Sequence, residues 1–140
     1  MSKPSFVGFQ EKIDIPVGFE QLLIEEEIST EHNQDQLFSL LSEPDLIAQW
    51  FVHIESLDSR PGGKVKIRNT QDQIIEAICT GFVPGKEISI ISDEFGNFTG
   101  KVIKGRNQNT LKISFALLTD RVSEKRSEFV GYINRLRVLL

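Results

Sequence analysis

Cysteine is nearly missing from this chain, which has a single cysteine, Cys79, among 140 residues. One thiol cannot form an internal disulfide, and it cannot supply the several thiolates of a structural zinc site. A lone cysteine also fits a reducing compartment, so we expect a cytoplasmic protein. Cys79 itself is expected to be a small core residue.

Long apolar segments are also missing. No run approaches the ~18 apolar residues that a transmembrane helix needs, so we predict no membrane span. The first twenty residues contain no apolar core of a signal peptide and no small-residue cleavage site. We therefore do not expect secretion by a signal peptide.

Positive charge is scarce, with 16 basic against 20 acidic residues and a net charge of −4. Proteins that follow a phosphate backbone usually carry a basic stripe, so we expect no nucleic-acid partner. The two histidines, His32 and His53, are too far apart in sequence to form a metal motif by spacing. No nucleophile elbow or phosphate loop is present, so we expect no cofactor and no metal.

What remains is a composition typical of one globular domain, with 39% apolar residues. We expect residues 1–19, with Pro4, Gly8, Pro16 and Gly18, to form an irregular N-terminal arm. Residues 20–140 are expected to form a single domain.

The domain begins with a predicted strand and two short helices. Gln21–Ser29 alternates with a period of two, which predicts a strand. Thr30 is expected to cap a helix from Glu31 to Leu41. Pro44 then starts a second helix, to Trp50, in which Leu46, Ile47 and Trp50 are spaced as on one helical face.

Beyond Trp50 the apolar period changes from 3.6 to 2. Six strands are predicted at 51–57, 64–69, 73–83, 86–92, 98–104 and 110–118, joined by short turns as in an antiparallel meander. An amphipathic helix over 123–140 follows. Its apolar stripe contains Phe129, Ile133, Leu136 and Leu140 with Tyr132 beside them, and its opposite face contains Glu124, Glu128, Asn134 and Arg135.

This element order predicts an α+β fold in which the long C-terminal helix covers a curved seven-stranded antiparallel sheet. One helix laid across a curled sheet does not fill the space beneath it. We therefore expect a cavity between the sheet and the helix, in the usual ligand-pocket range of ~300–1,000 Å³.

Four segments add a family resemblance. They are "EPDLIAQWF", "RPGGKVKI", "CTGFVPGKEISI" and "FVGYINRLRVLL". In this order they resemble the helix-grip (START/Bet v 1-like, SRPBCC) superfamily, in its branch related to the activator of Hsp90 ATPase homologue 1. Tyr132 stands where that branch often has Trp, which keeps an aromatic ring and adds a hydroxyl group.

The resemblance implies three alternative functions. The first is a binding module whose cavity holds a small hydrophobic or aromatic molecule, without catalysis. The second is a protein-interaction domain that regulates a chaperone or another partner. The third is an enzyme of the cyclase or hydratase type, for which Glu76, Glu26 or His53 would supply the polar group.

The expected cavity wall combines aromatic and apolar side chains with two polar groups. Its residues are Trp50, Phe51, His53, Glu76, Phe82, Phe98, Phe115, Phe129, Tyr132, Ile133 and Leu136. Glu26 and Glu76 each sit between two isoleucines in a strand, so each carboxylate enters the cavity if that face points inward. The alternative is that these strand faces point to solvent, and that the His53 side chain does so too.

Overall fold

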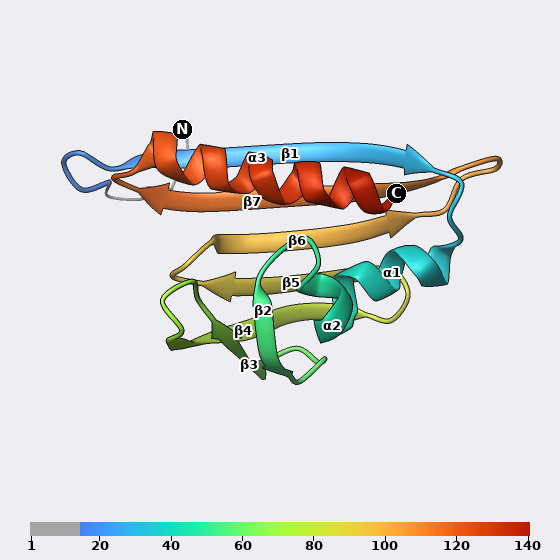
Figure 1. Cartoon of the computed structure of the whole chain (residues 1–140), viewed down its shortest axis with the longest axis horizontal. Helices are drawn as coiled ribbons and strands as arrows, with labels where there is room; N and C mark the ends of the chain where they lie inside the picture. Colours follow the sequence, from blue (N-terminus) through green and yellow to red (C-terminus); the bar gives the residue numbers. More distant parts are fainter. Residues whose placement is uncertain (1–14) are drawn as a thin grey trace, which may run out of the picture.

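A computed structural model describes residues 15–140 as one antiparallel sheet with three helices on one side (Figure 1). The elements in chain order are β1 (Glu20–Thr30), α1 (Gln34–Ser42), α2 (Pro44–Ile47), β2 (His53–Leu57), β3 (Gly63–Arg68), β4 (Ile74–Val83), β5 (Glu87–Ser92), β6 (Gly96–Ile103), β7 (Asn109–Thr119) and α3 (Val122–Leu139). This is the predicted order. Most of the expected arm, residues 1–14, lies outside the described residues.

The seven strands follow the spatial order β1-β7-β6-β5-β4-β3-β2. Strands β2 to β7 form the predicted meander, because each is joined to the next by a short turn. Strand β1 closes the other side by pairing with β7 along its whole length, from Glu20 opposite Thr119 to Thr30 opposite Asn109. The first and last strands of the chain are therefore neighbours, and α3 packs on the face that they share.

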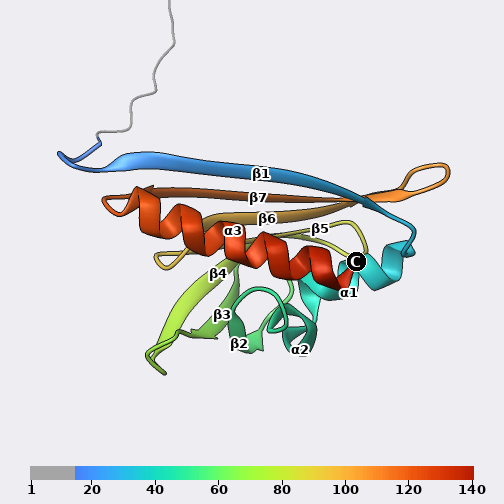
Figure 2. The ribbon, with the colours of Figure 1, turned by 45° about the horizontal axis from the view of Figure 1, so that its top comes forward.

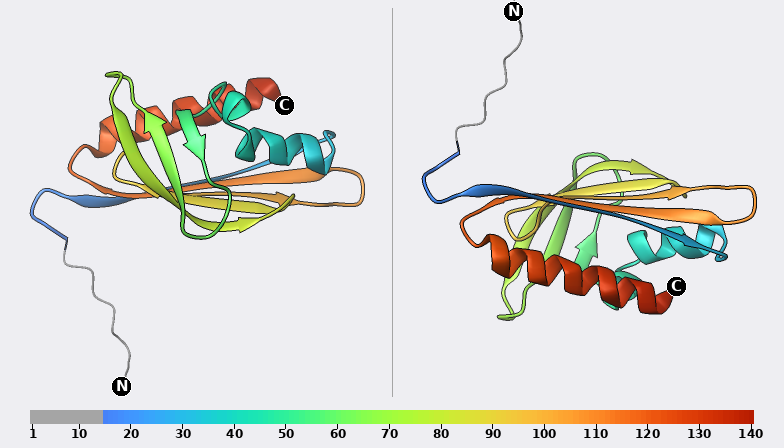
Figure 3. Two further views of the ribbon diagram at one scale, coloured as in Figure 1. Left: turned by 90° about the horizontal axis from the view of Figure 1, so that it is seen from below. Right: turned by 90° about the horizontal axis from the view of Figure 1, so that it is seen from above.

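The sheet is strongly twisted. Strands β1, β7, β6 and β5 form a long, nearly flat part, and β4, β3 and β2 curve up toward the helices (Figures 2 and 3). Two register shifts help this bend, one between Ile54 and Ser56 and one between Cys79 and Gly81. A bulge sharpens the local twist of a strand, and Gly81 stands at the second of these shifts.

Helix α3 lies over β1 and β7 (Figure 1) and presents Phe129, Ile133 and Leu136 to the core, where all three are buried. Helices α1 and α2 cover the end of the same face beside α3 (Figure 3). The apolar stripe predicted for the C-terminal helix is thus the stripe that is buried. No helix within residues 15–140 combines the length and apolar character needed to cross a membrane.

Two predictions about the short helices were wrong in detail. Helix α1 begins at Gln34, three residues later than expected, because Asn33 and Gln36 form a capping box that satisfies the first free amides. Thr30 instead remains buried in β1. Helix α2 ends at Ile47, so Trp50 lies in the turn that follows it and not within the helix.

The turn between β5 and β6 depends on Gly96, which has a φ of +73° and lies so close to β7 that an added Cβ would overlap the Ala116 carbonyl group. Gly62 also has a positive φ, +84°, but has open space around it.

We predict that Gly62→Ala lowers the free energy of unfolding by about 1 kcal/mol, the cost of the backbone conformation alone. Gly96→Ala should lower the free energy of unfolding by about 3 kcal/mol or more, because the backbone of β7 at Ala116 must also move.

Urea unfolding followed by the fluorescence of the single Trp50 measures both variants. Equal losses for the two variants would contradict the close approach of Gly96 to β7.

Candidate functional site

A hollow of about 370 Å³ opens between α3 and the curved strands β2 and β3. Its apolar lining comes from Ala48, Phe51, Val52 and Ile67. Its polar lining consists of His53, Arg68, Asn69, Thr70, Glu94, Glu128, Tyr132 and Arg135. A concave site of this size that combines apolar surface with polar side chains can hold a small molecule, although polar residues outnumber apolar ones in this lining.

Phe51 closes the bottom of this hollow. Its ring centroid lies 4.9 Å from those of both Phe95 and Phe98, and 5.0 Å from that of Tyr132. These distances are typical of favourable aromatic pairs. The aromatic rings therefore occupy the space beneath the centre of α3, and this hollow lies beside Phe51 and Tyr132.

Trp50 holds this floor in place from below. The side chain is fully buried, stacks on Phe51 at 5.1 Å and donates its indole Nε1–H to the Leu40 carbonyl oxygen at 2.8 Å. The hydrogen bond satisfies the only polar atom of the indole and ties the turn after α2 to helix α1. Trp50 is a core residue below the hollow and does not line it.

The other expected wall residues fall into two groups. Phe98, Phe115, Phe129, Ile133 and Leu136 are buried in the core that supports the floor. Phe82 packs against Phe38 of α1, with ring centroids 5.7 Å apart, and does not line the hollow. Of the eleven expected residues, Phe51, His53 and Tyr132 line the hollow itself.

The carboxylates proposed from the sequence lie elsewhere. Glu76 lies on the outer face of β4 with Ile74 and Ile78, and all three are exposed, so Glu76 is not part of the cavity wall. Glu26 does face α3, but it is only half-buried there and pairs with Arg137. Burial of Cys79 raises the pKa of its thiol, in keeping with a core residue.

Tyr132 brings a hydroxyl group to the mouth. The hydroxyl has no hydrogen-bond partner among the described residues, and the Arg135 guanidinium carbon lies 5.4 Å from the ring centroid. Burial raises the pKa of the phenol far above its usual range, and the nearby Glu128 and Glu94 carboxylates raise it further. Tyr132 therefore remains a neutral hydroxyl, able to donate or to accept a hydrogen bond.

Lys125 fastens the turn between β5 and β6 to helix α3. Its buried Nζ donates to the Glu94 carbonyl oxygen at 2.9 Å and to Glu128 Oε1 at 3.2 Å. A buried ammonium group needs such partners, because its transfer out of water is costly. The contact fixes Glu94 and Glu128 on one side of the mouth, next to Tyr132.

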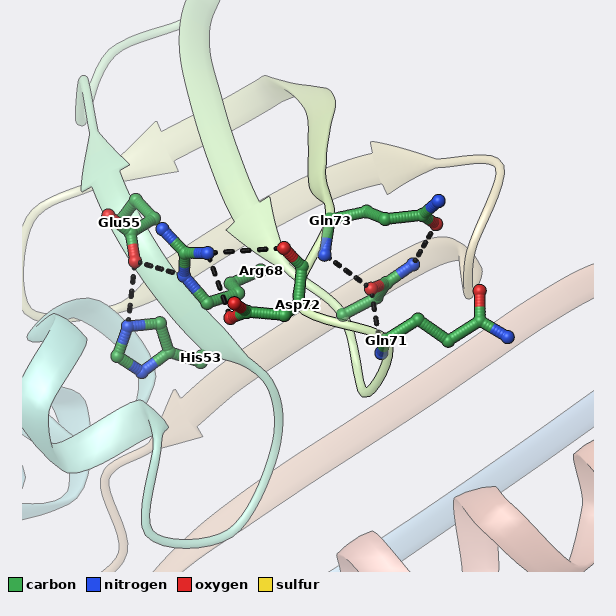
Figure 4. A network of polar contacts seen from close by, with 7 residues as sticks. His53, Glu55, Arg68, Gln71, Asp72 and Gln73 are labelled. Atoms are coloured by element: carbon green, nitrogen blue, oxygen red, sulfur yellow. Dashed lines mark hydrogen bonds and ion pairs between the residues drawn. The ribbon is translucent and has the colours of Figure 1, made fainter.

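The opposite rim is a network of exposed charges (Figure 4). Arg68 Nε lies 2.8 Å from Glu55 Oε2 and its Nη1 lies 2.9 Å from Asp72 Oδ1, while His53 Nε2 lies 3.0 Å from the same Glu55 oxygen. The hydrogen bond from Arg68 holds the pKa of Glu55 below its usual value. His53 is exposed and belongs to this rim, which places it at the mouth and not in the core.

Several residues that line the mouth were not predicted from the sequence. Glu128 and Arg135 were assigned to the solvent face of the last helix, yet both line the hollow with Tyr132. The spacing of four and three residues between Glu128, Tyr132 and Arg135 is the signal that identifies one helical face. Glu94 has no such signal, because a contact between distant segments brings it to the site. Among residues 15–140, no group of three acidic, histidine or cysteine side chains is arranged to hold a metal ion.

The raised pKa of Tyr132 predicts a stability change in alkali. An unfolded tyrosine ionises near pH 10, whereas the folded protein holds the proton to a higher pH. The unfolded state therefore loses its proton first, and the folding stability contributed by this group is complete below about pH 10 and falls as the pH rises above it.

Tyr132 is the only tyrosine, so the near-ultraviolet absorbance of tyrosinate reports on this residue alone. We expect tyrosinate to appear together with unfolding, as followed by Trp50 fluorescence. Ionisation near pH 10 in the folded protein would show that the hydroxyl is freely solvated.

Comparison with solved structures places the fold among known ones. CalU16 from Micromonospora echinospora is 13% identical, with 86% of this chain and 84% of that chain covered and a TM-score of 0.61. A protein from Mesorhizobium loti is 15% identical, over 86% and 96% of the two chains, with a TM-score of 0.67. The Aha1 dimer from Colwellia psychrerythraea is 13% identical, over 82% and 92%, with a TM-score of 0.62.

At these identities the likeness shows a shared fold alone. A search of curated proteins finds no match. The family model described as "Activator of Hsp90 ATPase homolog 1-like protein" matches residues 31–117, which run from the end of β1 into β7 and include the short helices and the floor of the hollow. The chain therefore belongs to the activator of Hsp90 ATPase homologue 1-like family, with the helix-grip fold that its four sequence segments predicted.

Proposed function

We propose that this protein is a binding module for a small hydrophobic or aromatic molecule, held in the hollow between α3 and strands β2 and β3. The single observation that carries the proposal is this hollow of about 370 Å³, in which apolar side chains such as Phe51, Val52 and Ile67 are combined with polar groups. Burial of an apolar ligand surface there would supply the main binding free energy, and the rim would orient the ligand.

The floor supports the proposal because it is preorganised. Phe51 is held by neighbours on several sides, including Phe98 below it and Tyr132 of α3 beside it. A ligand that stacks on these rings therefore needs little rearrangement of the protein, which lowers the entropic cost of binding. A planar aromatic or alicyclic ring is the ligand shape that best fits such a surface.

Binding alone is proposed, without a reaction. The strand carboxylates considered for catalysis do not meet in the hollow, since Glu26 pairs with Arg137 and Glu76 is on the outer face of β4. Glu128, which does line the hollow, is engaged by Lys125.

An NMR titration of ¹⁵N-labelled protein with 2-naphthol and with decanol tests the proposal. We expect shifts at the Trp50 indole, because it stacks on Phe51, and at amides of Val52, Ile67 and Tyr132. The variant Ala48→Phe places a ring in the mouth and should weaken binding at least about tenfold, equivalent to ~1.4 kcal/mol.

Ala116→Phe is the matched control. Ala116 is exposed on β7, and no lining residue of the hollow comes from that strand. This variant should bind the probes as the parent protein does. Equal binding by both variants would refute the site. A well-dispersed spectrum without any shifts would refute small-molecule binding and would turn attention to the chaperone or another protein partner.

A further inference from the structure

We propose that the mouth of this hollow selects ligands that carry a protonated amine in addition to an apolar ring. The inference rests on the proposed function, because it names the class of ligand for the same site. It follows from which charged groups at the mouth already have partners and which do not.

Two of the cations near the mouth are engaged by carboxylates. Arg68 lies within 2.9 Å of both Glu55 and Asp72. Lys125 is buried against Glu128 and the Glu94 carbonyl oxygen. Both cations therefore already have charge or carbonyl partners, which lowers the gain from binding a ligand anion.

The Glu94 carboxylate, unlike Glu55, Asp72 and Glu128, forms no ion pair, because no cation of residues 15–140 lies within ion-pair distance of it. Lys125 binds the backbone oxygen of Glu94 and leaves its side chain available at the hollow. Glu128 offers a second carboxylate beside it, of which one oxygen is bound to Lys125. Both acids lie near enough to Tyr132 to contribute to the raised pKa of its phenol, after the larger effect of burial.

The carboxylates outnumber the cations in this region. The mouth and its direct ion-pair partners contain four carboxylates, Glu55, Asp72, Glu94 and Glu128, against three permanent cations, Arg68, Lys125 and Arg135, with the His53 ring beside Glu55. A negative local potential beside aromatic rings favours an organic cation, which gains from the carboxylates and from the ring faces. The Tyr132 hydroxyl can accept a hydrogen bond from the same ammonium group.

Arg135 is the feature that would favour the opposite ligand. Like Glu94 it lies within ion-pair distance of no acid of the described chain. However, it stands over the Tyr132 ring, where it already makes a cation–π contact at 5.4 Å. A ligand carboxylate bound to Arg135 would share the hollow with the Glu94 and Glu128 carboxylates, so we expect the amine to be preferred.

Three probes with the same ring system test the inference by NMR or calorimetric titration at neutral pH. They are 2-naphthylmethylamine, 2-naphthalenemethanol and 2-naphthoate, which are cationic, neutral and anionic. We expect the amine to bind about threefold to tenfold more tightly than the alcohol at low salt, as for a partly exposed charge pair, and the carboxylate to bind most weakly. High salt should reduce the preference for the amine.

Glu94→Gln should bring the amine and the alcohol to equal affinity, and it should leave the fold intact because Lys125 holds the backbone of this residue and not its side chain. Glu25→Gln is the matched control, since it removes one negative charge on the exposed side of β1, away from the hollow. It should leave the preference for the amine unchanged.

The outcomes separate the two proposals. Equal affinities for amine and alcohol in the parent protein would overturn the amine preference, as would tighter binding of naphthoate that Arg135→Gln abolishes. The neutral alcohol reports on the hollow alone, so failure of all three probes would overturn the proposed function itself.

Discussion

The packing of Phe51 against its aromatic neighbours is the constraint on which the rest of the structure depends. The ring joins the turn after α2 to Phe98 of β6, Phe115 of β7 and Tyr132 of α3. Burying a ring of this size contributes roughly 1.5–3 kcal/mol from the removal of apolar surface alone. The same contacts fix how far α3 stands from the sheet, and hence where filled core ends and open space begins.

The curvature of the sheet places the hollow at one end of α3. Strands β2 to β4 turn toward the helix side (Figure 3), and Arg68 at the end of β3 lines the hollow together with Tyr132 of α3. Trp50 ties the turn after α2 to helix α1, because its indole donates a hydrogen bond to the Leu40 carbonyl oxygen beneath the floor. The fold thus closes the space under the centre of α3 and leaves it open between α3 and the end of β3.

The charges at the mouth are arranged by contacts between distant segments. Lys125 of α3 reaches the turn between β5 and β6, and Arg68 of β3 joins Glu55 of β2 to Asp72 of the following loop. The exposed ion pairs of Arg68 with Glu55 and Asp72 contribute little to the free energy of unfolding. Their main effect is to keep the side chains of the rim in one arrangement. The buried ammonium group of Lys125 has a larger structural role, because loss of its partners would leave a charge without water.

Local patterns in the sequence were sufficient for the order of the elements, the antiparallel meander and the buried stripe of α3. Each of these depends on periodicity within one segment, as for Phe129, Ile133 and Leu136. The orientation of β4 could not be read in this way, because isoleucines occupy both of its faces. Pairing with β3 and β5 buries Ala77 and Cys79 and leaves Glu76 in solvent.

The sequence by itself determined the fold family and most of the core, because burial of apolar side chains selects helices and strands by their periods. Of the wall residues expected from the sequence, Phe51, His53 and Tyr132 line the hollow. Only the tertiary structure decided which polar groups share the mouth, since Glu94, Arg68 and Tyr132 come from three separate segments. Their meeting depends on the twist of the sheet and on the contact of Lys125 with the Glu94 backbone, and neither is encoded in a local pattern.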